Sequence, residues 1–235
     1  MNLLAMETSS AVTSLALCRG SAIVAARAFP SKMSLCENLA REIEALLSHL
    51  RDEALTALAV SLGPGSFTSL RIGVMTAKAL AHRLVIPLVG VPTLEAIATP
   101  FAFEAGRVIA VLQPGWKNTV YVATYRGGAL GTLRGLSGPS ALESGAAVEH
   151  LQATDGELLL VGEAAVGHRD ALAAAMGDRI TFAPPSLCLP QAQFVAEAAR
   201  AQLAAAAPPS VHAVRPLYLV ASQAERVAGI DLGMT

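Results

Sequence analysis

The chain has 235 residues, of which 53% are hydrophobic and 15% charged, and its formal net charge is −1. This composition excludes an intrinsically disordered chain. The near-neutral charge, with no local run of Lys or Arg, disfavours tight and direct binding of tRNA or DNA. The length predicts two lobes, because single domains most often have about 100 to 150 residues.

The expected location is the cytoplasm, without contact with a membrane. No apolar run approaches the ~20 residues of a membrane-spanning helix. Residues 1–6 are typical of a strand and lack the basic start of a secretory signal. Cys18, Cys36 and Cys188 are widely spaced and form no C-x-x-C pair, which favours reduced thiols in a reducing compartment.

Short apolar runs at the start of the chain predict an antiparallel unit of three strands, at 2–6, 13–18 and 22–29. Ser34 with Glu37 has the spacing of a capping box, and apolar residues at helical period follow it. Alternating strands and helices then complete a βββαβαβα order. Their expected ranges are a helix at 34–50, a strand at 57–62, a helix at 69–84, a strand at 88–91 and a short helix after Thr93.

The second half begins in the same way after a boundary near 100–105. Three strands are expected, with a turn at Arg126-Gly127-Gly128 between the last two. Alternation continues, but fewer elements are recognisable. The expected ranges are strands at 107–112, 119–125 and 129–133, a helix at 140–152, a strand at 158–161, and helices at 163–176 and 191–206.

This repetition predicts the fold class: an α/β protein with two lobes of the actin-like ATPase (ribonuclease H-like) type. Each lobe opens with a three-strand run followed by alternating helices and strands, and the second lobe is reduced. We expect the first lobe at 1–103 and the second at 104–210. A segment near 215–230 is expected to pack back on the first lobe.

The turn Gly63-Pro64-Gly65-Ser66-Phe67-Thr68 precedes a helix. Its glycines permit a positive φ and a close approach of other backbone, and the helix N-terminus favours an anion. The spacing fits neither the P-loop nor the Rossmann fingerprint. A tight turn capped by Thr68 or Ser69 remains the alternative interpretation.

Glu7-Thr8-Ser9 ends the first strand, at the place where actin-like ATPases carry a carboxylate near phosphate and magnesium. Glu is one methylene longer than the usual Asp, and Mg²⁺ demands near-ideal geometry. A polar strand end without a ligand is therefore equally compatible. The predicted vestigial nucleotide or phosphate site comprises Glu7, Thr8, Ser9, Gly63, Gly65, Ser66 and Thr68.

No catalytic or metal site is predicted. Pro64 and Thr68 stand where a nucleophile elbow around Ser66 would need glycines. No two of the five histidines are spaced as a zinc-binding pair. The helix at 69–84 is apolar on nearly all sides, which is compatible either with a fully internal helix or with a subunit contact.

The run Ser61-Leu62-Gly63-Pro64-Gly65-Ser66-Phe67-Thr68-Ser69-Leu70-Arg71-Ile72-Gly73 resembles the signature of the TsaB (YeaZ) family of tRNA threonylcarbamoyladenosine biosynthesis proteins. The resemblance extends over most of the first hundred residues, including 3–9, 76–81, 86–91 and 94–96. It departs at 113–119, where acidic residues of the family are absent, and at Val220, where an Arg is usual.

The resemblance implies a non-catalytic subunit with no cofactor of its own. Its partners would be TsaD, which carries the catalytic metal histidines, and TsaE, an ATPase. Together they would make N6-threonylcarbamoyladenosine in tRNAs that read codons beginning with A, so this chain would meet tRNA only indirectly. ATP or ADP at an interface shared with TsaD, and a homodimer when TsaD is absent, are also compatible.

In this family the helices corresponding to 34–50 and 69–84 pair with TsaD. The predicted partner interface, with TsaD or with a second copy, comprises Leu35, Leu39, Ile43, Leu46, Leu70, Arg71, Val74, Ala77 and Lys78. Two other functions stay open. One is an independent ATP-dependent phosphotransferase or ATPase of the same superfold, and the other is a glycoprotease-like metallopeptidase, for which ligands and nucleophile are lacking.

Overall fold

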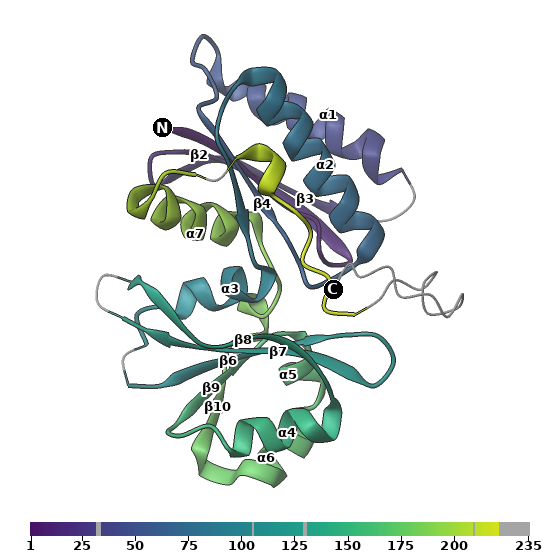
Figure 1. The fold of residues 1–235 in the computed structure, drawn as a ribbon, viewed down its shortest axis with the longest axis vertical. Coiled ribbons are helices and arrows are strands. Elements are labelled where there is room, and N and C mark those ends of the chain that lie inside the picture. The colour runs from purple at the N-terminus through teal and green to yellow at the C-terminus, as the bar shows by residue number, and fades with distance from the viewer. Residues whose placement is uncertain (32–33, 105, 129–130, 209, 221–235) are drawn as a thin grey trace. The chain divides into compact units, whose positions relative to one another are not determined.

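A computed structural model describes residues 1–31, 34–104, 106–128, 131–208 and 210–220 (Figure 1). The chain divides into two compact units. The first contains Met1–Ala96 and Pro190–Tyr218, and the second contains Ile97–Leu189 with Leu219 and Val220. Among the described residues, no helix has the length and apolar character needed to span a membrane.

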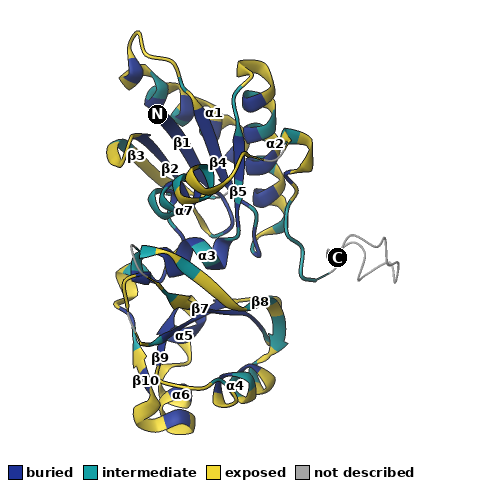
Figure 2. Ribbon diagram, turned by 60° about the vertical axis from the view of Figure 1, so that its left-hand side comes forward, coloured by how far each residue is buried: buried dark blue, intermediate teal, exposed yellow. Residues whose placement is uncertain are grey.

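The first unit is built on a five-stranded sheet with the order β3-β2-β1-β4-β5. The central strand β1 pairs antiparallel with β2 and parallel with β4. Both β1 and β4 are buried along their whole length (Figure 2), as expected for continuous apolar strands covered on both faces. The strands are Asn2–Glu7 (β1), Val12–Arg19 (β2), Ala22–Pro30 (β3), Ala57–Ser61 (β4) and Leu88–Val91 (β5).

Helices cover both faces of this sheet. On one face, α1 (Leu35–Leu47) and α2 (Phe67–Leu84) pack against even-numbered residues of β1 such as Leu4 and Met6. On the other, α7 (Ala192–Ala205) packs against Leu3 and Ala5 through a row of small side chains. The alternation of side chains along a strand explains this division, because successive residues point to opposite faces. The short helix α3 (Thr93–Ala98) follows β5.

The second unit repeats the same sheet topology. Its order, β10-β9-β6-β7-β8, is that of the first sheet read from the opposite edge, and β6 again pairs antiparallel with β7 and parallel with β9. The strands are Val108–Pro114 (β6), Thr119–Gly127 (β7), Leu133–Glu143 (β8), Leu158–Val161 (β9) and Ile180–Phe182 (β10). The helices are Ser144–Gln152 (α4), Glu163–Gly167 (α5) and Arg169–Met176 (α6).

The predicted α/β fold with two related lobes is therefore confirmed. The second sheet also keeps all five strands, including β10, which the sequence interpretation missed. The reduction lies in the helices: one continuous helix of 18 residues, α2, corresponds in order to α5 and α6 of 5 and 8 residues. Single 3₁₀ turns occur at Ser48–Leu50, Thr99–Phe101, Gly177–Arg179, Pro185–Leu187 and Val211–Ala213.

The domain division differs from the expected one. The sequence interpretation placed the helix at 191–206 in the second lobe, whereas α7 belongs to the first unit. Its buried alanines and Val195 need a flat apolar surface, and the face of the first sheet opposite α1 and α2 provides one. Residues 215–218 lie with the first unit as expected, and residues 221–230 are outside the described part of the chain.

Three local predictions were wrong. Ser34 has φ 77° and its side chain makes no capping hydrogen bond, so the capping box does not form. Of the third strand expected at 129–133, residues 129–130 lie outside the described part of the chain; β8 begins at Leu133 and runs through Pro139 to Glu143, where a helix was expected from 140. As an edge strand, β8 tolerates Pro and Gly because one side of its backbone needs no partner. The helix at 163–176 is divided at His168.

Candidate functional site

The ends of β1 and β4 bring two of the predicted motifs together. Because these strands are parallel neighbours, Glu7-Thr8-Ser9 lies beside the turn that follows β4. The backbone N–H of Ser66 donates to the carbonyl of Ser9 over 2.7 Å, and the N–H of Thr8 donates to Oγ of Ser61 over 3.2 Å. The two segments of the predicted phosphate site therefore bind each other directly.

Glycines make this contact close. A Cβ built on Gly65 would lie 2.3 Å from the carbonyl oxygen of Ser9, so only Gly fits there. Gly63 has φ +105°, and a Cβ on it would lie 2.9 Å from the carbonyl oxygen of Leu217. Ser66 and Thr68 are exposed, and α2 begins at Phe67 without a side-chain cap, so the alternative of a cap by Thr68 or Ser69 was wrong.

The Glu7 side chain is completely buried. Its Oε1 accepts from the backbone N–H of Ser9, whereas Oε2, like Oγ1 of Thr8, has no hydrogen-bond partner among the described residues. Burial raises the pKa of Glu7 above its ordinary value of 4.5, and hydrogen bonds from Ser9 and Ser61 only partly oppose this shift. Relative to water, the environment thus shifts the equilibrium toward the neutral acid.

This geometry does not fit magnesium-bound phosphate, the group that actin-like ATPases hold at this strand end. Mg²⁺ is bound through ionised carboxylates and water, and the carboxyl of Glu7 is sealed from water. The N–H of Ser66, which would face an anion, is already occupied by Ser9. Among the described residues, no group of three or more His, Cys, Asp or Glu side chains could hold a metal ion.

The second unit has a similar strand end, which sequence reasoning missed. Gln113 on β6 is buried, and its Nε2 donates to the carbonyl of Cys188 over 3.1 Å. A Cβ on Gly162, just after β9, would lie 2.1 Å from the carbonyl oxygen of Leu112, much as Gly65 approaches Ser9. The duplicated strand order was the signal that could have located it. The buried polar side chain near this strand end is a neutral amide, whereas at the end of β1 it is the carboxyl group of Glu7.

The apolar residues of the predicted partner interface lie inside the first unit. All seven are buried, with exposed fractions of 5% or less, and they cannot form the surface that a partner contacts. The i, i+4 stripe that identified them is the stripe that faces the chain's own sheet. They are Leu35, Leu39, Ile43, Leu46, Leu70, Val74 and Ala77.

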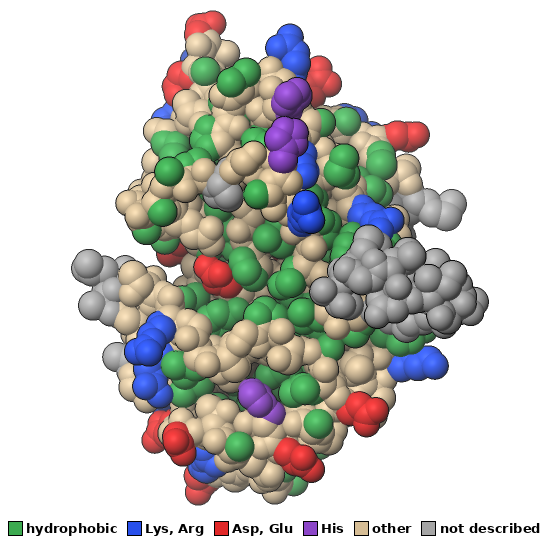
Figure 3. Space-filling model, in the orientation of Figure 1, with side chains coloured by type: hydrophobic (Ala, Val, Ile, Leu, Met, Phe, Trp, Pro, Cys, Tyr) green, Lys and Arg blue, Asp and Glu red, His purple; other side chains and the backbone are tan. Residues whose placement is uncertain are grey.

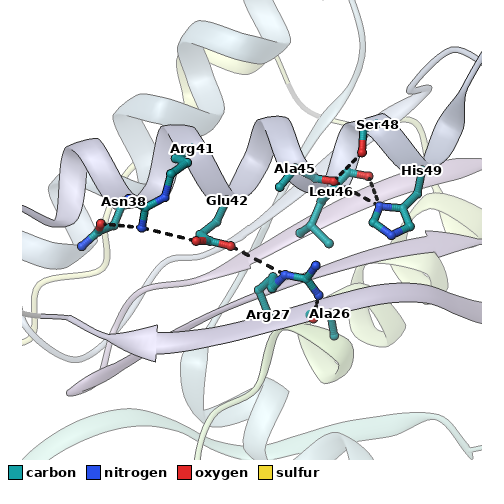
Figure 4. A network of polar contacts seen from close by, with 9 residues as sticks. All are labelled: Ala26, Arg27, Asn38, Arg41, Glu42, Ala45, Leu46, Ser48 and His49. Carbon is teal, nitrogen blue, oxygen red and sulfur yellow. Dashed lines mark hydrogen bonds and ion pairs between the residues drawn. The ribbon is translucent and has the colours of Figure 1, made fainter.

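The outward faces of these two helices differ in character. On α2, Met75 is 63% exposed and Ala79 is also exposed. On α1 the corresponding face is polar: Figure 4 shows Arg41 between Asn38 and Glu42, and Glu42 also pairs with Arg27 of β3. Such exposed ion pairs contribute little stability. The apolar surface that remains open therefore lies on α2.

Arg71 and Lys78, the two charged residues of the predicted interface, contact the C-terminal part of the described chain. Nε of Arg71 donates to the hydroxyl of Tyr218 over 3.0 Å. Nζ of Lys78 donates to the carbonyls of Val214 and His212 over 3.0 and 3.3 Å. The residues around Val214 are thus part of this surface, and the sequence carried no periodic pattern that would have revealed them.

Comparison with known proteins agrees with the resemblance found in the sequence. The chain is 30% identical over 128 residues to the tRNA threonylcarbamoyladenosine biosynthesis protein TsaB of Bacillus subtilis (strain 168), a match covering 54% of this chain and 56% of that protein. It is 34% identical over 110 residues to TsaB of Escherichia coli (strain K12), covering 46% and 47%. The chain thus spans about half the length of these curated relatives.

The solved structure of YeaZ from Pseudomonas aeruginosa has a TM-score of 0.75 and 22% sequence identity, and the match covers 93% of this chain and 99% of that one. This likeness shows a shared fold. The model of the family TsaD, described as tRNA N6-adenosine threonylcarbamoyltransferase, matches residues 31–226. Because that match covers well over half of the sequence, the chain belongs to the TsaD family.

Proposed function

We propose that this chain is a non-catalytic subunit in the biosynthesis of N6-threonylcarbamoyladenosine in tRNA, acting as a scaffold for TsaD together with TsaE. The names of the relatives and of the family support a role in this tRNA modification. The observation that carries the non-catalytic part is the closed strand end, where Ser9 and the turn bind each other and Glu7 is buried. In this proposal, tRNA meets the chain only within the complex.

The role in tRNA modification is tested by depleting the protein in its host and measuring threonylcarbamoyladenosine in tRNA by mass spectrometry. We expect the modified nucleoside to fall, and plasmid-borne wild-type protein to restore it. An unchanged level would overturn the assignment.

The proposed contact with TsaD uses the outward face of α2, centred on Met75 and Ala79. Met75→Glu places a charge on this open apolar surface, so we expect loss of co-purification with TsaD while the melting temperature is retained. Leu136→Glu is the matched control, because Leu136 is 41% exposed on β8 of the other unit. Equal co-purification of both variants would exclude this face. A homodimer formed without TsaD would use the same face and would also be lost in Met75→Glu.

An independent ATPase or phosphotransferase is the second candidate, and it is motivated by Glu7-Thr8-Ser9 at the end of β1 and by the turn after β4. The buried Glu7 and the occupied N–H of Ser66 argue against it. Calorimetric titration of the purified chain with ATP and Mg²⁺ separates the two functions. We expect no heat of binding, so that any ATP or ADP at an interface with TsaD would depend on groups from the partner.

A further inference from the structure

Residues 210–218, here called the strap, run back along α2 (Figure 1). The backbone N–H of Leu217 donates to the carbonyl of Leu62 over 2.7 Å, just before the turn that leads into α2. Further along the helix, the two carbonyls bound by Lys78 tie the strap to its middle. The strap therefore covers one flank of α2 from its first turn to Lys78.

An aromatic latch closes the C-terminal end of the strap. The ring of Tyr218 stacks on Phe67 with 4.5 Å between centroids and an interplanar angle of 30°. The guanidinium of Arg71 lies 4.0 Å from the centroid of Phe67 and 5.8 Å from that of Tyr218. The stacking on Phe67, the hydrogen bond from Arg71 and the longer of the two cation–π contacts thus all depend on this one strap side chain.

The strap is attached by few contacts that depend on its side chains. Val214 is the only strap residue among those described that is buried in the core, and Tyr218 is half-buried. Val211 also packs, partly buried, against this core, and the ring of His212 lies 6.4 Å from that of His82 between centroids. The remaining polar attachment uses backbone groups of Leu217, Val214 and His212. Backbone hydrogen bonds with one or two side-chain anchors are the means by which grooves bind extended peptides. Segments held in this way open locally at low free-energy cost.

Opening would release two cationic side chains of α2, Arg71 and Lys78, from their partners on the strap. Helix α2 carries Arg71, Lys78 and Arg83 and no Asp or Glu, and none of the three forms an ion pair among the described residues. Figure 3 shows Lys, Arg and His side chains gathered over α2 and the adjoining C-terminal segment. The strap satisfies Arg71 and Lys78 with a phenol and with carbonyls, groups that a carboxylate of another protein would replace with stronger, charge-assisted bonds.

We propose that the strap is a releasable cover, which occupies the flank of α2 formed by Phe67, Arg71 and Lys78 and competes there with an acidic segment of the partner protein. The release itself is a property of the isolated chain. Only the identity of the partner rests on the proposed function. The apparent affinity for the partner is then the intrinsic affinity multiplied by the fraction of molecules in which the strap is open.

Release is tested by amide hydrogen exchange in the full chain. Tyr218→Ala removes the latch and should accelerate exchange at Leu217 by about tenfold or more, since 1.4 kcal/mol corresponds to a factor of ten. Tyr218→Phe keeps the stacking and should have a smaller effect. The amide of Leu58, bonded to Pro87 between buried strands, should be unchanged in both, which reports an intact fold. Unchanged exchange at Leu217 in Tyr218→Ala would overturn the proposal.

Competition is tested with a fluorescent synthetic peptide of residues 210–220. It should bind Tyr218→Ala at least about tenfold more tightly than wild type, because the wild-type strap competes at a high effective concentration. Adding Arg71→Ala to Tyr218→Ala should abolish this binding. Equal affinity of the peptide for wild type and for Tyr218→Ala would overturn the proposal that the strap can be displaced by a competing segment.

The same variant separates this proposal from the proposed function. Tighter binding of purified TsaD by Tyr218→Ala than by wild type supports competition with the partner. Equal, measurable affinities would overturn competition while leaving the scaffold role intact. Absence of TsaD binding by both proteins would overturn the scaffold role, and the exchange and peptide measurements would still decide whether the strap opens.

Discussion

Gly73 on α2 lies directly against the side chain of Thr8 at the end of β1: a Cβ built on Gly73 would be 2.2 Å from Oγ1 of Thr8 and 2.8 Å from its Cγ2. Thr8 is fully buried, and it directly follows β1, which is buried along its whole length. This contact fixes how deeply α2 sits on the first sheet. It also explains why a helix interior here contains the residue with nearly the lowest helix propensity.

Gly73→Ala should destabilise the chain. The methyl group gains about 1 kcal/mol in helix propensity, but overpacking against Thr8 costs about 1 to 3 kcal/mol or more, so we expect a net loss in urea unfolding. Gly145→Ala on α4 is the matched control, because a Cβ there meets nothing within 4 Å and should be neutral or stabilising. Adding Thr8→Ala should recover part of the loss, and a strictly additive double variant would contradict the contact.

Glu7→Gln should remove a pH dependence from the stability of the first unit. The folded-state pKa of Glu7 is raised, mainly by burial, so folding favours its protonated form. The contribution of Glu7 to the unfolding free energy is complete below its ordinary pKa of 4.5, and it is lost as pH rises through the folded-state pKa. Wild type should therefore lose stability relative to Glu7→Gln as pH increases above about 4.5, measured as the difference between urea unfolding free energies.

Glu53→Gln provides a control of opposite sign. A hydrogen bond from Asn2 lowers the pKa of Glu53, with the charge of Arg19 acting in the same direction. The contribution of Glu53 to the unfolding free energy is present above its ordinary pKa, and it is lost as pH falls through the folded-state pKa. Wild type should thus lose stability relative to Glu53→Gln on acidification. A Glu7→Gln difference that is flat between pH 4.5 and 8, a range set around the usual Glu pKa of about 4.3, would show that Glu7 is ionised in the fold.

Burial and contacts between distant residues explain which parts of the fold the sequence predicted and which it did not. Continuous apolar runs predicted β5 and β9 to the residue, since a strand buried on both faces leaves few alternatives. The seven apolar residues that were predicted to contact a partner are buried instead, because an apolar stripe has the same period whether it meets the chain's own sheet or another protein. The sequence did not reveal which unit α7 joins or where the strap runs. Both depend on contacts between residues far apart in the chain, such as Leu217 with Leu62.

Val74→Asp, although it changes a residue of the originally predicted interface, should act through folding. Val74 is 1% exposed, so a carboxylate there would be buried without a partner, at a cost of several kcal/mol. We expect a large fall in melting temperature by circular dichroism and loss of TsaD binding as a consequence. Met75→Glu, one residue away and 63% exposed, should leave the melting temperature within about 2 °C of wild type. Equal melting temperatures for the two variants would contradict the buried position of Val74.

Gly63→Ala should cost more stability than the same change at Gly20. Both glycines have a positive φ, but Gly20 lies at +59°, inside the left-handed region that other residues enter at modest cost, with open space around it. Gly63 lies at +105°, and its added methyl would meet Cδ1 of Leu70 at 2.8 Å and the carbonyl oxygen of Leu217 at 2.9 Å. Strain of about 1 to 3 kcal/mol is therefore joined by a clash with the strap.

The clash also predicts a local effect that strain alone would not cause. In Gly63→Ala, exchange at the amide of Leu217 should accelerate more than at Leu58, because relieving the clash displaces the strap before it disturbs the sheet. Gly20→Ala should lower the unfolding free energy by about 1 kcal/mol and leave the ratio of the two exchange rates unchanged. If Gly63→Ala destabilised both amides to the same extent, the turn after β4 and the strap would unfold only with the whole unit, and the strap could not open independently.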